Sequence, residues 1–271
     1  MIRIVRQDLN KALSTFVQSC DKHNFPARLL TGYDYSDEMI EPIQQACDKT
    51  LSTLLPPSQD WTPQNGQSLF WPLVSRIMAR AFVGPELWNS DEWHWVVSSY
   101  FQAGLAASQR VRDQYHPWLR WSAKYFDKDV KAIYAARRKG QELLQPLIDA
   151  RITDALDRDT SREPGFNDGV QWLVDAYMAE NKPVKAEEIM QDEAFLVAAS
   201  LHGTTFTALS ILFDLIDRPE SLAEIRAEIP RVYAEYGSWT RQSLGALRVL
   251  DSFMKESQRL HNFQYSTPRR F

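Results

Sequence analysis

One long stretch without charge limits what this chain can fold into. Between Ala194 and Phe213 there is no Asp, Glu, Lys or Arg, and apolar residues crowd both ends of the stretch. Pro219 ends the apolar pattern a few residues later, because the residue before a proline is driven out of the α region. A helix without charge over such a length either spans a membrane or lies buried on all sides in a large protein.

The flanks and the centre of this stretch favour the buried helix. Asp192, Glu193 and Asp214 border it, and no cluster of Lys or Arg accompanies them as it would beside a membrane span. Its centre holds a histidine, a glycine and several threonines, which hydrocarbon tolerates poorly. We therefore expect a buried helix over 194–213, distorted near Gly203, with a membrane span as the other interpretation.

Composition excludes several classes of protein. The chain has 271 residues and a net charge of −4, so no broad basic surface favours nucleic acid. Its two cysteines, Cys20 and Cys47, form no disulfide framework and no zinc-binding spacing, and its histidines are scattered, so we expect no metal site among them. The N-terminal residues show neither a signal-peptide core nor an anchor helix, and an intracellular, reducing compartment is expected.

Helical periodicity fills the segments between glycines and prolines, and no convincing strand alternation is present. Asn89-Ser90-Asp91 is typical of a helix N-terminus, and the polar residues from Arg158 to Gly169 predict a loop. The charged run Arg137-Arg138-Lys139 indicates a solvated face. We expect a mainly α chain, one domain over 1–271, with helices near 4–17, 38–55, 66–83, 91–105, 127–157, 170–178, 194–213, 219–236 and 247–260.

The centre of the uncharged helix carries residues suited to binding. Ala199, His202 and Gly203 fall on one stripe at helical spacing, where small residues would let a flat ligand approach the backbone. His202 and Thr204 would then hydrogen-bond to a small group beside the helix. The competing interpretation is that Gly203 permits close helix–helix contact, while the threonine hydroxyls bond back to carbonyls one turn earlier.

A second place is Glu256-Ser257-Gln258-Arg259, whose acid and base share a helix face at i, i+3. Such a pair contributes little when exposed, whereas a buried pair needs further partners to offset its lost hydration. By itself, this four-residue pattern is common and carries little information.

Several blocks of the sequence follow one another in a characteristic order. They are Ser75 to Leu87 with Trp93, Leu201-His202-Gly203-Thr204-Thr205, Arg218-Pro219-Glu220 and Lys255-Glu256-Ser257-Gln258-Arg259. Together they resemble the fungal cytochrome P450 family of heme-thiolate monooxygenases, in which an oxygen-binding helix with a His-Thr-Thr centre precedes a Glu-x-x-Arg helix. The resemblance implies a partial P450 helical fold, from about the third helix through the Glu-x-x-Arg helix and without the heme-cysteine loop.

The resemblance also implies roles on the distal side of a heme. Ala199 and Gly203 would lie against the cofactor, with His202 and Thr204 as the catalytic distal-helix positions. The implied reaction inserts one oxygen atom from O₂ into a hydrophobic intermediate of secondary metabolism, with electrons from a flavoprotein reductase. Family members are usually anchored to the endoplasmic reticulum membrane, whereas this chain shows no membrane anchor.

Further positions would serve the proximal side. By the same resemblance, Glu256 and Arg259 would form a buried structural pair behind the heme. Arg270 would match an arginine that approaches a heme propionate. Both expectations depend on the family pattern and not on the local sequence.

The chain departs from the family pattern at two places. The family holds its iron through a cysteine in a Phe-x-x-Gly-x-x-x-Cys-x-Gly loop, and these 271 residues contain no such loop. Cys20 and Cys47 precede the distal helix and lack the glycine-rich surroundings. Gly203 stands where the proton-delivering threonine is expected, and Thr204 is rotated by about 100° around the helix. We expect this chain alone to be catalytically incompetent; the alternative is a non-catalytic helical remnant or interaction module that binds no heme.

Overall fold

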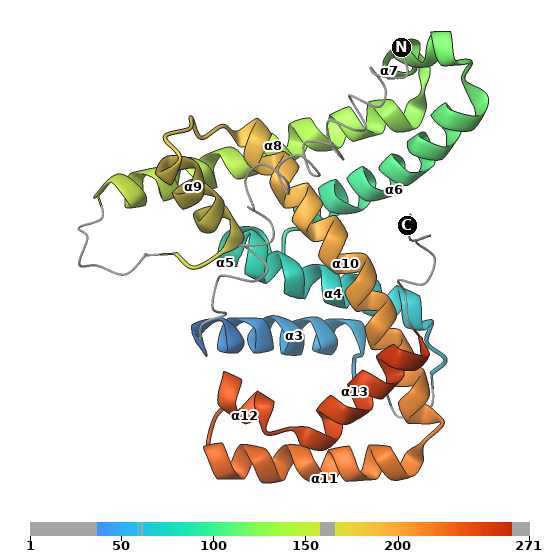
Figure 1. The fold of residues 1–271 in the computed structure, drawn as a ribbon, viewed down its shortest axis with the longest axis vertical. Helices are drawn as coiled ribbons and strands as arrows, with labels where there is room; N and C mark the ends of the chain where they lie inside the picture. Colours follow the sequence, from blue (N-terminus) through green and yellow to red (C-terminus); the bar gives the residue numbers. More distant parts are fainter. Residues whose placement is uncertain (1–36, 59, 61, 158–165, 262–271) are drawn as a thin grey trace, which may run out of the picture. The chain divides into compact units, whose positions relative to one another are not determined.

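The computed structural model describes residues 37–58, 60, 62–157 and 166–261, and every regular element within these ranges is a helix (Figure 1). This confirms the mainly α prediction; the helix expected at 4–17 lies outside the described residues. The elements are η1 (Asp37–Met39), α3 (Ile40–Leu54), α4 (Gly66–Phe82), α5 (Gly84–Leu87), α6 (Asp91–Gln114), η2 (Pro117–Ser122), α7 (Ala123–Phe126), α8 (Lys128–Asp157), α9 (Gly169–Ala179), α10 (Ala186–Ile216), α11 (Pro219–Tyr236), α12 (Arg241–Gly245) and α13 (Arg248–Leu260).

Local signals in the sequence locate several helix ends. Ser90 Oγ accepts a hydrogen bond from the backbone N–H of Trp93 at 3.3 Å, as an N-cap does. Pro219 begins α11, and Gly237, with a φ of 74°, ends it in the left-handed conformation that glycine adopts without strain. None of the helices in the described ranges has the length and apolar character needed to cross a bilayer, which argues against the membrane-span interpretation of 194–213.

The chain divides into two compact units. The first includes the described residues of Met78–Ala199, and the second includes those of 37–77 and 200–261. Both α4 and α10 have one part in each unit, so each unit combines segments that are distant in the sequence. The expectation of a single domain over 1–271 stays a prediction.

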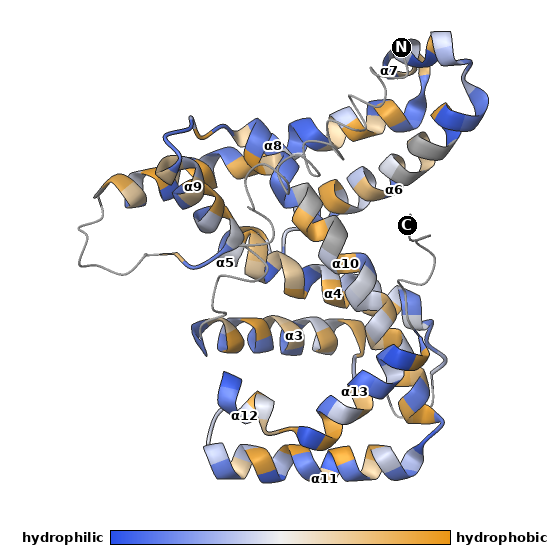
Figure 2. Cartoon of the chain, viewed as in Figure 1, coloured by the Kyte–Doolittle hydropathy of each residue, from blue (hydrophilic) through white to orange (hydrophobic). Residues whose placement is uncertain are grey.

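In the first unit, α8 packs along α6 and also contacts α9. Figure 2 shows hydrophobic and hydrophilic residues alternating along α8, as expected for a helix with one buried face. The run Arg137-Arg138-Lys139 is partly to fully exposed, which confirms the predicted solvated face. Large side chains that are fully buried in this unit include Trp93, Val96, Leu144, Ile148 and Leu173.

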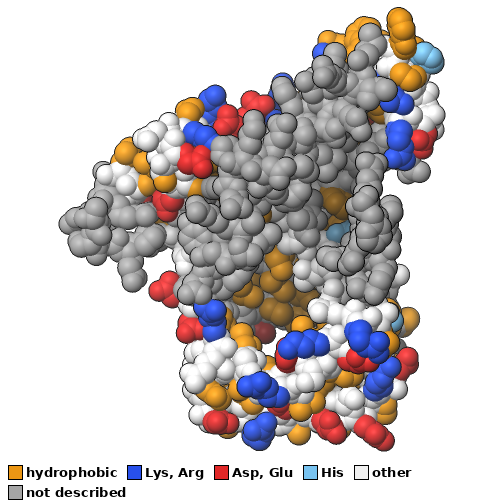
Figure 3. All heavy atoms as spheres, in the orientation of Figure 1, with side chains coloured by type: hydrophobic (Ala, Val, Ile, Leu, Met, Phe, Trp, Pro, Cys, Tyr) orange, Lys and Arg blue, Asp and Glu red, His pale blue; other side chains and the backbone are white. Residues whose placement is uncertain are grey.

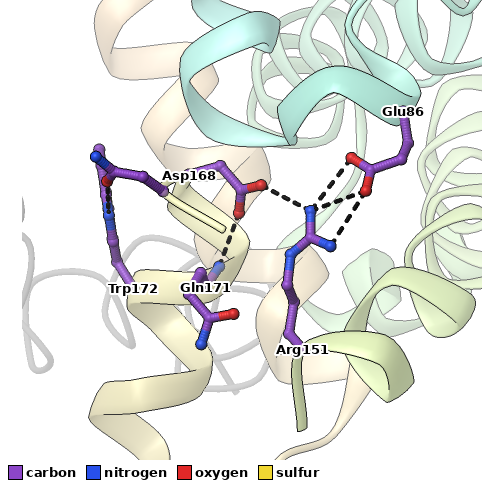
Figure 4. A network of polar contacts seen from close by, with 6 residues as sticks. Glu86, Arg151, Asp168, Gln171 and Trp172 are labelled. Carbon is purple, nitrogen blue, oxygen red and sulfur yellow. Dashed lines mark hydrogen bonds and ion pairs between the residues drawn. The ribbon is translucent and has the colours of Figure 1, made fainter. Parts of the chain in front are cut away.

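A buried ion network joins α5, α8 and the start of α9 (Figure 4). The Arg151 side chain is 1% exposed, and its guanidinium donates to Asp168 at 2.7 Å and to Glu86 at 3.1 Å. The guanidinium carbon also lies 3.5 Å from the centre of the Phe166 ring. Asp168 Oδ1 accepts a hydrogen bond from the backbone N–H of Gln171 at 2.9 Å and so caps α9. One buried carboxylate is therefore shared between an ion pair and a helix N-terminus.

A second acidic cluster lies between α9 and the start of α10. Tyr177 Oη donates to Asp192 Oδ2 at 2.9 Å, and burial raises the pKa of Asp192 to about 6 although this hydrogen bond acts in the opposite direction. Glu193 is fully buried, and its carboxyl oxygens have no hydrogen-bond partner among the described residues. Burial, reinforced by the carboxylates of Asp168 and Asp192, raises the pKa of Glu193 well above its ordinary value. The neutral form of Glu193 therefore fits this site best.

In the second unit, α11 packs against α12 and α13. Glu228 on α11 is 4% exposed and accepts hydrogen bonds from the backbone N–H groups of Val249 at 2.9 Å and Leu250 at 3.1 Å. Burial acts to raise the pKa of Glu228, but these hydrogen bonds outweigh it and the pKa is lowered. A carboxylate from one helix thus serves as the N-terminal cap of another.

The Glu256–Arg259 pair is exposed, so the expectation that it is buried is wrong for this chain. Arg259 donates to both carboxylate oxygens of Glu256, at 2.8 and 2.6 Å, but the Arg259 and Glu256 side chains are 67% and 56% exposed. The physical reason is helix register: α13 buries Ser257 and part of Phe253, and Glu256 and Arg259 lie off that stripe.

The buried network predicts the effect of removing Arg151. Arg151→Ala leaves the Asp168 carboxylate buried without its guanidinium, so we expect the free energy of unfolding to fall by about 3–5 kcal/mol, measured by urea unfolding. Arg137→Ala is the matched control, because Arg137 lies on the same helix and pairs at 3.0 Å with Glu187, which is 69% exposed. The control should lose only about 0–1 kcal/mol. Equal losses would contradict the assignment of Arg151 as the buried partner.

Asp192 predicts a dependence of stability on pH. Its pKa is raised by folding, so the stabilisation of its protonated form is complete below the ordinary pKa of 3.8 and is lost as the pH rises through about 6. Asp192→Asn keeps an acceptor for Tyr177 but does not titrate. Between roughly pH 4 and pH 7 the variant should therefore lose less stability than the parent chain, measured as urea midpoints. Parallel profiles would show that Asp192 titrates normally.

Because the Glu256–Arg259 pair is exposed, removing it should change the stability of the chain much less than removing a buried pair would. Arg259→Ala should leave the urea midpoint nearly unchanged, because both side chains are largely solvated. Glu228→Ala, which removes the buried cap of α13, provides the comparison and should lower the midpoint clearly. If Arg259→Ala destabilises the chain as much as Glu228→Ala does, the pair is buried in solution and the original expectation holds.

Candidate functional site

The helix that carries the predicted site, α10, runs without interruption from Ala186 to Ile216. The distortion expected at Gly203 is absent, because one glycine costs a helix only about 1 kcal/mol relative to alanine. The expectation that the helix is buried on all sides is also wrong. Phe206 is 46% exposed and Phe213 is 59% exposed, so one side of α10 is open in the second unit despite its lack of charge.

His202 lies between two aromatic rings of the second unit. The Trp71 ring, on α4, has its centre 5.8 Å from the centre of the imidazole with the two planes at 85°. The Phe206 ring, one turn further along α10, lies at 5.2 Å and 68°. Both are edge-to-face contacts, an arrangement that aromatic rings prefer to direct face-to-face stacking. These two contacts restrict the orientation of the half-buried imidazole ring.

Gly203 faces open space. A Cβ atom built on Gly203 would meet no atom within 4 Å outside its own stretch of helix. This argues against close helix–helix contact at Gly203 within the described part of the chain, because a residue that permits such contact would have a neighbour there. The backbone at Gly203 is therefore accessible to a flat group that lies against the helix.

The adjacent threonines differ in environment. Thr204 is exposed, whereas Thr205 is 2% exposed and its hydroxyl has no hydrogen-bond partner among the described residues. Thr205 therefore does not bond back to the carbonyl one turn earlier, as the competing interpretation required. Sequence reasoning did not single out Thr205 as a candidate residue. The available signal was its spacing, four residues after the buried Leu201 and three after His202.

The remaining predicted site residues are not assembled around His202 by the described structure. Ala199 belongs to α10, but its side chain lies outside the described atoms. Arg270 lies outside the described residues altogether. Glu256 and Arg259 form their exposed pair on α13. The candidate site in the described structure is thus a short segment of α10, with Trp71 of α4 as its neighbour.

The residues present fit only one side of a heme. Open space beside Gly203 suits the distal side. Cys47 does not suit the axial position, because burial and the nearby Asp48 raise the pKa of its thiol and so disfavour the thiolate that binds iron. Cys20 lies outside the described residues. Within the described ranges, no group of three or more His, Cys, Asp or Glu side chains is arranged to hold a metal ion.

Comparison with known proteins finds one family. The Cytochrome P450 family model matches residues 98–271. Cytochrome P450 monooxygenase cheE of Chaetomium globosum is 36% identical over 82% of this chain and 43% of that protein. Cytochrome P450 monooxygenase ccsG of Aspergillus clavatus is 34% identical over 84% of this chain and 44% of that protein. Pyrichalasin C-7 hydroxylase of Pyricularia grisea is 33% identical over 87% of this chain and 46% of that protein.

The matches extend through the part of the chain that carries the candidate site. Residues 98–271 include all of α10, with His202, Gly203 and the two threonines, and also α11 and α13. The chain spans less than half the length of each of these three curated relatives. Both the family match and the identity to the relatives lead to one conclusion: the chain belongs to the cytochrome P450 family.

Proposed function

We propose that this chain forms part of a heme-dependent monooxygenase that oxidises a hydrophobic intermediate of fungal secondary metabolism. The observation that carries the proposal is the centre of α10, where His202 and two threonines flank an accessible Gly203 inside the region matched by the family. In this family the cofactor is heme, which when bound supplies the oxygen chemistry. The protein supplies the pocket and the groups that hold or move protons.

Each residue of the α10 centre has a distinct part in this proposal. Ala199 and Gly203 leave room for the heme against the helix. His202, whose ring contacts those of Trp71 and Phe206, provides a side chain that can hydrogen-bond to a group beside the helix. Thr204, next to Gly203, is the proposed proton-delivering hydroxyl.

Thr205 is a second candidate for proton delivery. Its hydroxyl is buried and has no hydrogen-bond partner among the described residues, so it has unused capacity to bind a water or a ligand. In the complete enzyme, we propose that Arg270 approaches a heme propionate.

The substrate class and the partner follow from the family and its relatives. The name of the Pyricularia grisea relative states that it hydroxylates pyrichalasin at C-7. By analogy, we propose a hydrophobic small molecule as substrate and a flavoprotein reductase as the source of electrons. We also propose attachment of the complete enzyme to the endoplasmic reticulum membrane, as is usual in the family.

The heme ligand provides a direct test on this chain. Because neither cysteine has the sequence surroundings of the axial ligand, the purified chain mixed with heme should give no thiolate-type carbon monoxide difference spectrum after reduction. If such a spectrum appears, Cys20→Ala and Cys47→Ala identify the ligand. That result would overturn the view that this chain alone is incompetent.

The sequence of the transcript beyond the codon for Phe271 distinguishes a monooxygenase from a helical protein that binds no heme. An in-frame Phe-x-x-Gly-x-x-x-Cys-x-Gly loop downstream of Phe271 would support the monooxygenase, and the protein extended to include it should show the thiolate spectrum. A transcript without that loop would favour the alternative, a helical remnant or interaction module that binds no heme. Thr204→Val and Thr205→Val in the extended protein then show which hydroxyl delivers protons, by the loss of coupling between oxygen consumption and product.

A further inference from the structure

Glu193, near the start of α10, is a buried acid that neither the ion network nor the candidate site uses. Acidic side chains are scattered over the surface seen in Figure 3, whereas Glu193 is fully buried. Both of its carboxyl oxygens are enclosed, and neither has a hydrogen-bond partner among the described residues. Burying a polar group in this way costs free energy, and the cost is far larger for the charged form. Ionisation of Glu193 is therefore in conflict with the packing around it.

The carboxyl group of Glu193 is packed tightly against the start of α9. A Cβ atom built on Gly169, the first residue of α9, would lie 2.9 Å from Glu193 Oε1 and 2.7 Å from the backbone carbonyl oxygen of Phe82. Phe82 is the last residue of α4. The Glu193 side chain thus lies where the end of α4 meets the beginning of α9, and all three segments belong to the first unit.

The negative groups at this junction disfavour the ionised form of Glu193. The charges of Asp168, at the start of α9, and of Asp192, on α10 itself, both act against it. The carbonyl oxygen of Phe82 belongs to the negative end of the α4 dipole. The charge of Lys182 acts on Asp192. An ionised Glu193 would therefore add a further negative charge to a place that already holds several.

The positive groups at the same junction have other partners. The N-terminus of α9 favours a carboxylate, but Asp168 occupies that position and accepts from the backbone N–H of Gln171 at 2.9 Å (Figure 4). The guanidinium of the buried Arg151 is bound by Asp168 at 2.7 Å and by Glu86 at 3.1 Å. Nothing in this arrangement compensates the charge of an ionised Glu193 among the described residues.

We propose that Glu193 is a protonation switch for the junction between α4 and α9. When it is protonated, the carboxyl group is neutral, its O–H can donate to the Phe82 carbonyl oxygen, and the junction stays closed. When it releases its proton to water, the carboxylate has no donor to bind, and the start of α9 opens to hydrate it. The switch is independent of the proposed enzymatic function.

The direction of the switch follows from the pKa of Glu193. Burial, together with Asp168 and Asp192, raises this pKa well above its ordinary value of 4.5. The stabilisation that the neutral form contributes is therefore complete below pH 4.5 and is lost as the pH rises through the raised pKa. The junction is closed in acid and opens towards alkaline pH.

Hydrogen exchange of the whole chain as a function of pH tests the switch. The backbone N–H groups of Gln171 and Trp172 report on the start of α9, because they donate to Asp168 at 2.9 and 3.0 Å. After correction for the intrinsic exchange rate, their protection should fall by up to about tenfold for each pH unit above the raised pKa, since opening releases one proton. Glu193→Gln and Glu193→Leu cannot ionise, so their protection should stay constant between roughly pH 5 and pH 9.

Two controls separate Glu193 from other effects of pH. The start of α8 is a matched helix end, because Asp127 caps it by accepting from the backbone N–H of Val130 at 3.1 Å and also pairs with Arg110. Its protection should not follow that of α9. Asp192→Asn removes a neighbouring acid but leaves Glu193 in place, so the loss of protection at α9 should persist and begin at a lower pH.

Several results would overturn the switch. They are constant protection of α9 in the parent chain, an unchanged pH dependence in both Glu193 variants, and a parallel loss at the start of α8, which would mean that the chain unfolds as a whole. Circular dichroism checks that each variant is folded. If both neutral replacements fail to fold, the proposal is also wrong, because it requires that a neutral side chain fits this position.

Discussion

The structure depends on α10 being one continuous helix that serves both units. Its first part, with Ile189, Met190 and Leu196 buried, completes the packing of the first unit. Its second part supplies Leu201 and Thr205 to the second unit while leaving Phe206 open. From Ala194 to Ala199, where Leu196 and Val197 are buried, a charged side chain would have to be desolvated, so burial favours the uncharged sequence there. In the second part, the same lack of charge leaves an apolar side exposed.

Buried polar groups determine how the elements of the first unit meet. Arg151 and Asp168 lose their hydration on burial. Their ion pairs and hydrogen bonds with each other, with Glu86 and with the start of α9 replace it, so the three elements must pack together for these charges to be stable. Glu193, close to the same place, has no such partner among the described residues and is accommodated as a neutral acid. The unit thus combines a buried ion pair with a carboxyl group whose ionisation would be unfavourable.

The candidate site on α10 places an aromatic-packed histidine beside accessible backbone. His202 is fixed by Trp71 and Phe206, whereas the backbone beside it at Gly203 is open. A rigid polar side chain next to accessible backbone suits a group bound flat against the helix, and this agrees with membership of the cytochrome P450 family. Burial and the nearby Asp48 raise the pKa of the Cys47 thiol, which disfavours the thiolate that binds heme iron.

The sequence by itself indicated where the longer helices lie, since caps, prolines and apolar spacing are local properties, but it missed the short helices α5, α7 and α12. It located the cap at Ser90 and the start of α11 at Pro219. Only the tertiary structure decided which residues are buried. Arg151 lies on a helix with many charged residues, yet its side chain is buried, where Glu86 and Asp168 from other segments pair with it. Likewise, the pair on α13 is exposed because the covered face of α13 carries Ser257, and the sequence alone does not say which face of a helix another element covers.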